Sequence, residues 1–104
     1  MVCNNVLGHE YKVYNANRKC SDTEHEGTNR LSQGSAVNIP NPTLNQKVEG
    51  CKNQCEITQD CQFFFLQNGH NGEENFCIFY KSCDIMVAND KPGIIFKKHG
   101  IGNS

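Results

Sequence analysis

The distribution of cysteine constrains this chain more than any other feature of its sequence. Seven cysteines occur in 104 residues, and three of them lie in the stretch "CKNQCEITQDC" (51–61). The others are Cys3, Cys20, Cys77 and Cys83. A cluster of this kind serves as a metal site, a reactive centre or a disulfide framework. The choice among these decides what the chain can do.

Zinc is the first alternative. Structural zinc sites favour cysteines two residues apart, or Cys and His at short fixed spacings. Here Cys51, Cys55 and Cys61 are separated by three and by five residues. The histidines are His9, His25, His70 and His99, and none lies at ligand spacing from a cysteine. We therefore expect no metal site.

A catalytic cysteine is the second alternative. It needs a histidine partner and surroundings that lower the pKa of its thiol. No cysteine is distinguished from the others in this way, and the sequence shows neither paired carboxylates in a plausible cleft nor a phosphate-binding loop. We expect a non-catalytic protein without a cofactor.

Disulfide bonds are the remaining alternative, and composition favours them. Only 37% of the residues are hydrophobic, Trp is absent and the mean hydropathy is −0.63. A domain of this size has a thin core, so crosslinks add needed stability. Disulfides form in oxidising compartments, which predicts a secreted protein or one exposed at the cell surface.

Charge and hydropathy exclude other classes. The net charge is −1 and no basic stripe occurs, so we expect no nucleic-acid partner. No apolar run approaches the roughly 18 residues of a membrane span, so we expect no membrane insertion. The opening "MVCNNVLGHE" lacks the regions of a signal peptide. We interpret the chain as a mature product or an excised domain.

A helix is predicted near the middle of the chain. Thr43 and Gln46 have the spacing of a capping box at its start. An apolar stripe follows at helical spacing, formed by Leu44, Val48, Cys51 and Cys55. Gly50 lowers the stability of an isolated helix by about 1 kcal/mol relative to Ala, so this helix should depend on tertiary contacts.

Two antiparallel strands should follow. "CQFFFLQ" (61–67) and "FCIFYKSC" (76–83) are rich in aromatic residues, and "NGHNGEEN" (68–75) between them carries two Asn-Gly turn signals. Phe63 and Phe65 should face one side of the sheet and Phe64 the other. The second of these two faces is either covered by the helix or a loop, or it exposes an aromatic side chain for contact with a partner. A turn at "NDKPG" and a last strand at 94–98 complete this half, with "HGIGNS" left unassigned.

The first 42 residues are more polar. "EYKVYN" (10–15) alternates as a short strand, with Lys12 and Tyr14 on one face and Tyr11 and Val13 on the other. "SDTEHEGTNRLSQGS" (21–35) has the composition of turns and loops. We predict a single domain over 1–104, with its core at 43–98 and one or two strands contributed by 1–42.

The positions of the cysteines limit the possible disulfide pairs but do not determine them. Cys51 and Cys55 lie on one face of the predicted helix, the face that must meet the sheet. Cys77 lies within a strand and can meet either of them. Cys61 follows closely enough to fold back onto the last helical turn.

The region 43–83 resembles the PAN/apple domain family. The resemblance consists of a helix carrying C-x3-C, a short turn, a cysteine before an aromatic strand, and a returning strand with its own cysteine, which here read "CKNQCEITQDCQFFFLQ" and "NFCIFYKSC". It implies an α+β fold in which an antiparallel sheet of about five strands cradles one helix. It also implies the pairs Cys51–Cys77 and Cys55–Cys61.

Three cysteines remain without a partner in these implied pairs. Cys20 and Cys83 look like a third pair, joining the N-terminal half to the sheet. Cys3 is then unpaired, or forms an intermolecular bond.

PAN/apple domains are non-catalytic extracellular modules, and by resemblance we expect an adhesion or recognition function with a protein or carbohydrate ligand. The alternative is a structural subunit that binds copies of itself in an extracellular filament or surface layer. An unpaired Cys3 favours this alternative, because an odd cysteine in a secreted chain can form a bond to another copy.

Overall fold

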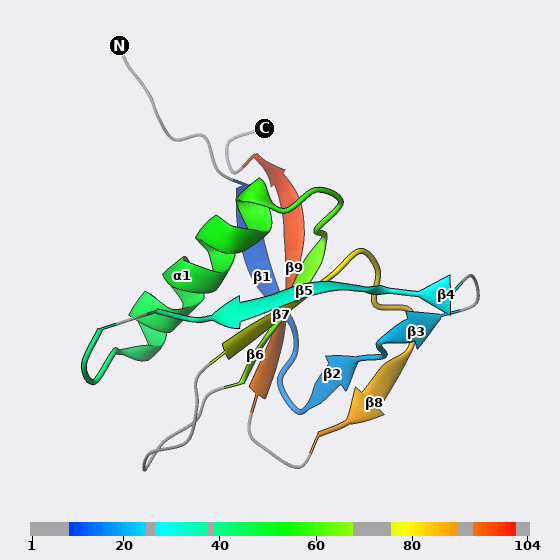
Figure 1. Ribbon diagram of the computed structural model, residues 1–104, viewed down its shortest axis with the longest axis horizontal. Helices are drawn as coiled ribbons and strands as arrows, with labels where there is room; N and C mark the ends of the chain where they lie inside the picture. The colour runs from blue at the N-terminus through cyan, green and yellow to red at the C-terminus, as the bar shows by residue number, and fades with distance from the viewer. Residues whose placement is uncertain (1–8, 25–26, 38, 68–75, 90–92, 102–104) are drawn as a thin grey trace.

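A computed structural model describes residues 9–24, 27–37, 39–67, 76–89 and 93–101 of the chain. Its main body is a five-stranded antiparallel sheet in the order β1-β9-β6-β7-β5, with α1 packed on one face (Figure 1). In that order the strands are His9–Asn15, Gly93–Ile101, Phe63–Gln67, Phe76–Tyr80 and Arg30–Ser35, and the helix is Leu44–Ile57. This confirms the predicted α+β fold class.

Two short ribbons accompany the main sheet. One pairs β2 (Arg18–Cys20) with β8 (Met86–Ala88), and the other pairs β3 (Thr23–Glu24) with β4 (Gly27–Thr28). Cys20 and Met86 from the first ribbon pack against the sheet face that α1 does not cover. Both faces of the sheet are therefore covered over its middle strands.

The predicted hairpin of two aromatic strands is confirmed. Strand β6 lies between β7 and β9, so that Phe64 is opposite Phe79 on one side and Phe96 on the other. Phe64 and Phe96 stack with their ring centroids 4.9 Å apart. These central strands form the core because every side chain from Phe63 to Leu66 is buried.

The predicted alternation of the three phenylalanines is also confirmed. Phe64 packs in the cluster beneath α1, while Phe63 and Phe65 pack in the cluster on the opposite face. Their exposed fractions are 8%, 0% and 1% for Phe63, Phe64 and Phe65. The hypothesis of an exposed aromatic at these positions is wrong, because the ribbons and the helix cover both faces.

Helix α1 begins as predicted. The Thr43 hydroxyl accepts from the backbone N–H of Gln46 at 3.1 Å, and the Gln46 side chain accepts from the backbone N–H of Thr43 at 2.8 Å. Cys51 and Cys55 are buried against the sheet as expected. Leu44 departs from the expected stripe, since it is 46% exposed. Lys47 is the buried residue of the first two turns instead.

Three disulfide bonds link the elements. Cys51–Cys77 joins α1 to β7, Cys55–Cys61 joins the end of α1 to the segment before β6, and Cys20–Cys83 joins β2 to the segment between β7 and β8. These are the pairs that the family resemblance implies, together with the third pair that remained. Cys3 lies outside the described residues.

Two sequence predictions need correction. Residues 30–35 form strand β5 rather than a loop, because their backbone pairs with β7 although their side chains are mostly polar. The last strand runs past Lys98 to Ile101, since the start of β1 pairs there, with His9 opposite Ile101. The turns predicted at 68–75 and within 89–93 fall wholly or mainly on residues outside the described part.

One buried polar side chain connects the N-terminal ribbons to the sheet. Asn29 is buried, and its amide nitrogen donates to the backbone oxygens of Ser21 at 3.0 Å and Ser82 at 2.6 Å. Its amide oxygen accepts from the backbone N–H and the hydroxyl of Ser82 at 2.9 and 2.7 Å. Ser21 and Ser82 adjoin Cys20 and Cys83, so Asn29 holds both chain segments next to that disulfide.

Replacing Asn29 should therefore lower the free energy of unfolding by more than an ordinary polar substitution does. Asn29→Ala leaves partly buried backbone groups of Ser21 and Ser82 without these partners, and we expect the free energy of unfolding to fall by about 2 kcal/mol. Denaturant titration measures this, with the exposed Asn17→Ala as control, for which we expect a change within about 0.5 kcal/mol. Equal effects of the two substitutions would contradict the assignment.

Candidate functional site

A groove of about 460 Å³ runs between α1 and the segment that follows β5. Its lining residues are Val37, Ile39, Asn45, Gln46, Glu49, Gly50 and Asn53. The helix supplies most of the polar groups, and the segment after β5 supplies the two apolar side chains. None of these residues was identified as a site by sequence reasoning.

Gly50 sets the width of this groove. A Cβ atom at Gly50 would lie 1.7 Å from the backbone oxygen of Ala36, so the helix and the neighbouring segment approach as only glycine permits. Gln54, one turn later, donates from its side-chain nitrogen to the backbone oxygen of Ser35 at 2.6 Å. These two contacts fix the wall opposite the helix.

The polar lining follows helical spacing. Asn45, Glu49 and Asn53 recur every four residues along the exposed side of α1, which places them about 6 Å apart along the helix axis. The Glu49 carboxylate pairs with the Lys52 ammonium at 3.2 Å. A side-chain amide both donates and accepts hydrogen bonds, so Asn45 and Asn53 suit uncharged polar groups such as peptide bonds or sugar hydroxyls, and the Glu49 carboxylate adds an acceptor between them.

One part of the groove, the polar stripe on α1, could have been recognised from the sequence. The stripe lies on the side of the helix opposite Cys51 and Cys55, and two of its three members, Asn45 and Asn53, are amides. Sequence could not show that Val37 and Ile39 form the other wall, because that depends on the position of β5 in the sheet.

Enlarging Gly50 should distort the groove. Gly50→Ala gains about 1 kcal/mol of helix propensity, but its methyl group overlaps backbone that cannot rotate away, and we expect a net loss of about 2 kcal/mol in unfolding free energy. Denaturant titration with Gly34→Ala as control measures this.

At Gly34 an added Cβ meets only the flexible end of Gln54, so we expect a loss below about 1 kcal/mol. If Gly50→Ala proved stabilising, the close approach at Ala36 would be refuted.

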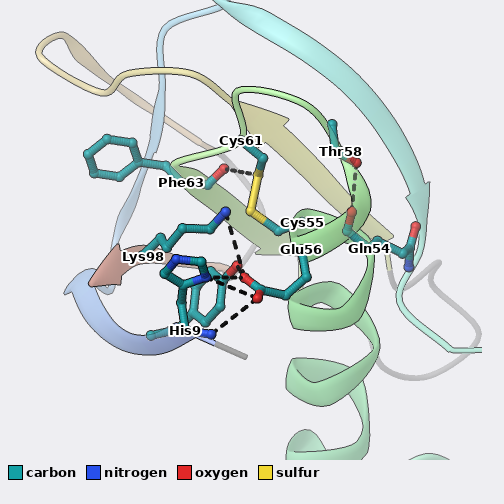
Figure 2. Close-up of polar contacts among 9 residues, drawn as sticks. His9, Gln54, Cys55, Glu56, Thr58, Cys61, Phe63 and Lys98 are labelled. Atoms are coloured by element: carbon teal, nitrogen blue, oxygen red, sulfur yellow. Dashed lines mark hydrogen bonds and ion pairs between the residues drawn. A yellow bond between two sulfur atoms is a disulfide. The ribbon is translucent and has the colours of Figure 1, made fainter. Parts of the chain in front are cut away.

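A second polar cluster surrounds Glu56 near the end of α1 (Figure 2). Its carboxylate accepts from the backbone N–H of His9 at 3.1 Å, contacts Nδ1 of His9 at 3.0 Å and accepts from the Tyr11 hydroxyl at 2.5 Å. The Lys98 ammonium lies 3.6 Å from the same carboxylate. Residues from β1 and β9 thus converge on one helical side chain.

The cluster favours the ionised carboxylate. Burial acts to raise the pKa of Glu56, but hydrogen bonds from Tyr11 and His9 and the charge of His9 outweigh it and lower the pKa to about 2. Burial and the neighbouring Glu56 carboxylate raise the pKa of Tyr11 above its usual range. Tyr11 therefore stays a neutral donor to an anionic acceptor.

A histidine held by a carboxylate also occurs in catalytic dyads, which makes His9 a candidate base. Within the described part of the chain, however, the His9 ring bonds only to Glu56, and no hydroxyl or thiol donates to it. Lys98 and Tyr11 also contact the Glu56 carboxylate. The geometry is that of a structural contact that holds β1 and β9 against the helix.

The Glu56 contacts should shape the stability at acidic pH. Because the folded-state pKa is lower than the unfolded value of about 4.3, the contribution of Glu56 is complete above that value and disappears as pH falls through about 2. We expect Glu56→Gln to flatten the decline of unfolding free energy between these pH values, and to lose about 1–2 kcal/mol at neutral pH.

Denaturant titrations from neutral pH down to about pH 2 test this, with Glu49→Gln as the matched control on the same helix. An identical pH profile for the parent and Glu56→Gln would show that the carboxylate contributes nothing to acid stability.

The other predicted candidates can now be placed. Cys20, Cys51, Cys55, Cys61, Cys77 and Cys83 are all in disulfides. Among the residues that the structure describes, no group of three or more His, Cys, Asp or Glu side chains is arranged to hold a metal ion. His99 lies in β9, while His25 and His70 fall outside the described ranges.

Comparison with known proteins identifies no relative. No family model, no curated protein and no solved structure matches the chain. The helix that the structure describes is not long and apolar enough to cross a membrane.

Proposed function

We propose that this chain is a non-catalytic extracellular recognition module of the PAN/apple type, which binds a protein or carbohydrate ligand in the groove beside α1. The assignment to the PAN/apple type rests on the sequence resemblance over 43–83. The α+β architecture supports this assignment, because a five-stranded sheet packs against one helix that two disulfides link to neighbouring segments.

The groove is the observation that carries the proposal. Its walls are held by the Gly50–Ala36 approach and the Gln54–Ser35 hydrogen bond, so the cavity exists before a ligand arrives. Ligand sites are commonly preformed, with apolar surface and a few placed polar groups. Here Val37 and Ile39 supply the apolar surface, and the stripe of Asn45, Glu49 and Asn53 supplies the polar groups.

The proposed location follows from the crosslinks. Three disulfides suggest an oxidising compartment. Secretion or display at the cell surface is the simplest setting for such a module.

Substitutions in the groove should separate binding from folding. A glycan array and an extended-peptide library identify a ligand for the parent protein. Asn45→Ala and Asn53→Ala should then each weaken its binding about tenfold, because each removes hydrogen bonds worth about 1–2 kcal/mol.

Asn17→Ala, an exposed amide outside the groove, serves as the control and should bind as the parent does. A ligand insensitive to both groove substitutions would place the site elsewhere, and failure to bind in either library would count against a recognition function.

Self-assembly is the second candidate, and the sheet edges favour it. Strand β1 is an edge strand interrupted by two register shifts and carrying Glu10 and Lys12, features that discourage pairing. The other edge, β5, has no charged residue from Leu31 to Ser35. A strand of another copy can add to such an edge.

Light scattering over a range of concentrations tests this candidate, using the parent, Cys3→Ser and Gln33→Lys. Self-assembly predicts larger species that Gln33→Lys reduces, because a charge on the β5 edge opposes pairing. It also predicts that Cys3→Ser removes any covalent dimer. A monomer at every concentration in all three proteins would contradict it.

A further inference from the structure

The polar stripe of the groove repeats at nearly the same interval as an extended peptide. Asn45, Glu49 and Asn53 are exposed, line the groove and follow one another at steps of four residues. Four residues advance about 6.0 Å along a helix axis, and an extended peptide advances about 6.6–6.8 Å for every two residues. The two repeats differ by roughly 0.7 Å in each step, which side chains of this length absorb over two steps.

The hydrogen-bonding groups of an extended peptide follow that repeat. Every second residue directs both its N–H and its C=O toward the same edge of the chain. A side-chain amide carries both a donor and an acceptor, so Asn45 can bond both groups of one residue, and Asn53 both groups of the residue four positions away. Between them the Glu49 carboxylate accepts from one N–H, because a carboxylate is an acceptor only.

The two asparagines of the stripe are available to a ligand. Within the described residues, neither Asn45 nor Asn53 uses its side-chain amide in a hydrogen bond. The glutamines of the same helix differ, since the Gln46 amide oxygen accepts from the N-cap backbone N–H and the Gln54 amide nitrogen donates to the end of β5. The glutamines therefore stabilise the walls of the groove, and the asparagines face its interior.

The wall opposite the stripe suits an apolar side chain. Val37 and Ile39 line it, and Ile39 is 44% exposed. Successive side chains of an extended peptide point to opposite faces, so a peptide that lies along the stripe directs every second side chain into the groove. An apolar side chain at that position covers surface of Ile39 that is otherwise in water.

The charge of the groove favours a neutral or basic ligand. Of the lining residues, Glu49 is the charged one. It pairs with Lys52 at 3.2 Å, where the side chains of Glu49 and Lys52 are 62% and 30% exposed. An ion pair this exposed contributes little to stability, so a cationic group of the ligand can take the place of Lys52. An acidic peptide is repelled by the Glu49 carboxylate.

We propose that the groove binds an extended peptide segment of a partner protein through the backbone of that segment, with Asn45, Glu49 and Asn53 as the contacts. The stripe spans about 12 Å along the helix axis, the length of about four extended residues. The proposal rests on the recognition function of the groove and narrows its ligand from a protein or carbohydrate to a neutral or basic peptide with an apolar side chain at every second position.

Backbone methylation of a peptide probe tests the proposal without altering the protein. The probe is a capped hexapeptide of alternating valine and threonine, and two analogues carry N-methyl groups at either the odd or the even interior residues. Binding is measured by NMR titration of the isotope-labelled protein. One analogue should bind about tenfold more weakly than the probe, because its N–H groups at the helix edge are lost. The other should bind as the probe does, since its methyl groups lie at the opposite edge.

Variants of the protein identify the side chains that contact the peptide backbone. In the double variant Asn45→Ala/Asn53→Ala, the difference between the two methylated analogues should shrink from about tenfold to about threefold, because only the Glu49 carboxylate still accepts from that edge. Asn17→Ala is the control and should keep the full difference. An unchanged Tm shows that each variant is folded. Replacing threonine by lysine in the probe should strengthen binding, and replacing it by glutamate should weaken it.

Four results would overturn the proposal. These are an equal loss of affinity in both methylated analogues, parent-like binding of the probe by the double variant, tighter binding of the glutamate probe than of the lysine probe, and no binding of any of these peptides at millimolar concentration. If a glycan binds instead and depends on Asn45 and Asn53, this inference fails while the recognition function of the groove stands. If neither glycans nor peptides bind, both fail.

Discussion

The disulfide between Cys51 and Cys77 sets where the helix lies on the sheet. It joins the middle of α1 to β7, a strand with neighbours on both sides. Closing a loop of 26 residues stabilises the fold by about 3.5 kcal/mol in the chain-entropy account. Because the helix is held there, its buried side faces Phe64 and its polar stripe of Asn45, Glu49 and Asn53 faces outward along the groove. The same position brings Gly50 against Ala36 and carries Glu56 to β1 and β9.

Local signals made much of this fold predictable. The Thr43 capping box, the buried pair Cys51 and Cys55, and the alternating phenylalanines all follow from spacing within one element. Each of these depends on neighbours a few residues away, which a sequence shows directly. The resemblance to a known family then supplied the sheet as a whole, which periodicity did not.

Features that depend on distant partners were missed. Strand β5 has polar side chains and was interpreted as a loop, because only its pairing with β7 makes it a strand. Leu44 fits the apolar stripe by spacing but is half exposed, with Lys47 buried in its place. The groove could not be predicted without the position of Ala36, Val37 and Ile39 relative to α1. The pairing of β1 with β9, which places Lys12 opposite Lys97, joins residues 85 positions apart and could not be predicted from local pattern.

Three specific disulfides hold the helix and the N-terminal ribbons to the sheet. Mass measurement of the intact protein, with peptide mapping of its crosslinks, tests this most directly. We predict a mass lower by two hydrogens for each of three bonds, and crosslinked peptides joining Cys20 to Cys83, Cys51 to Cys77 and Cys55 to Cys61. Six free thiols at these positions, a different pairing or stoichiometric zinc would contradict the account.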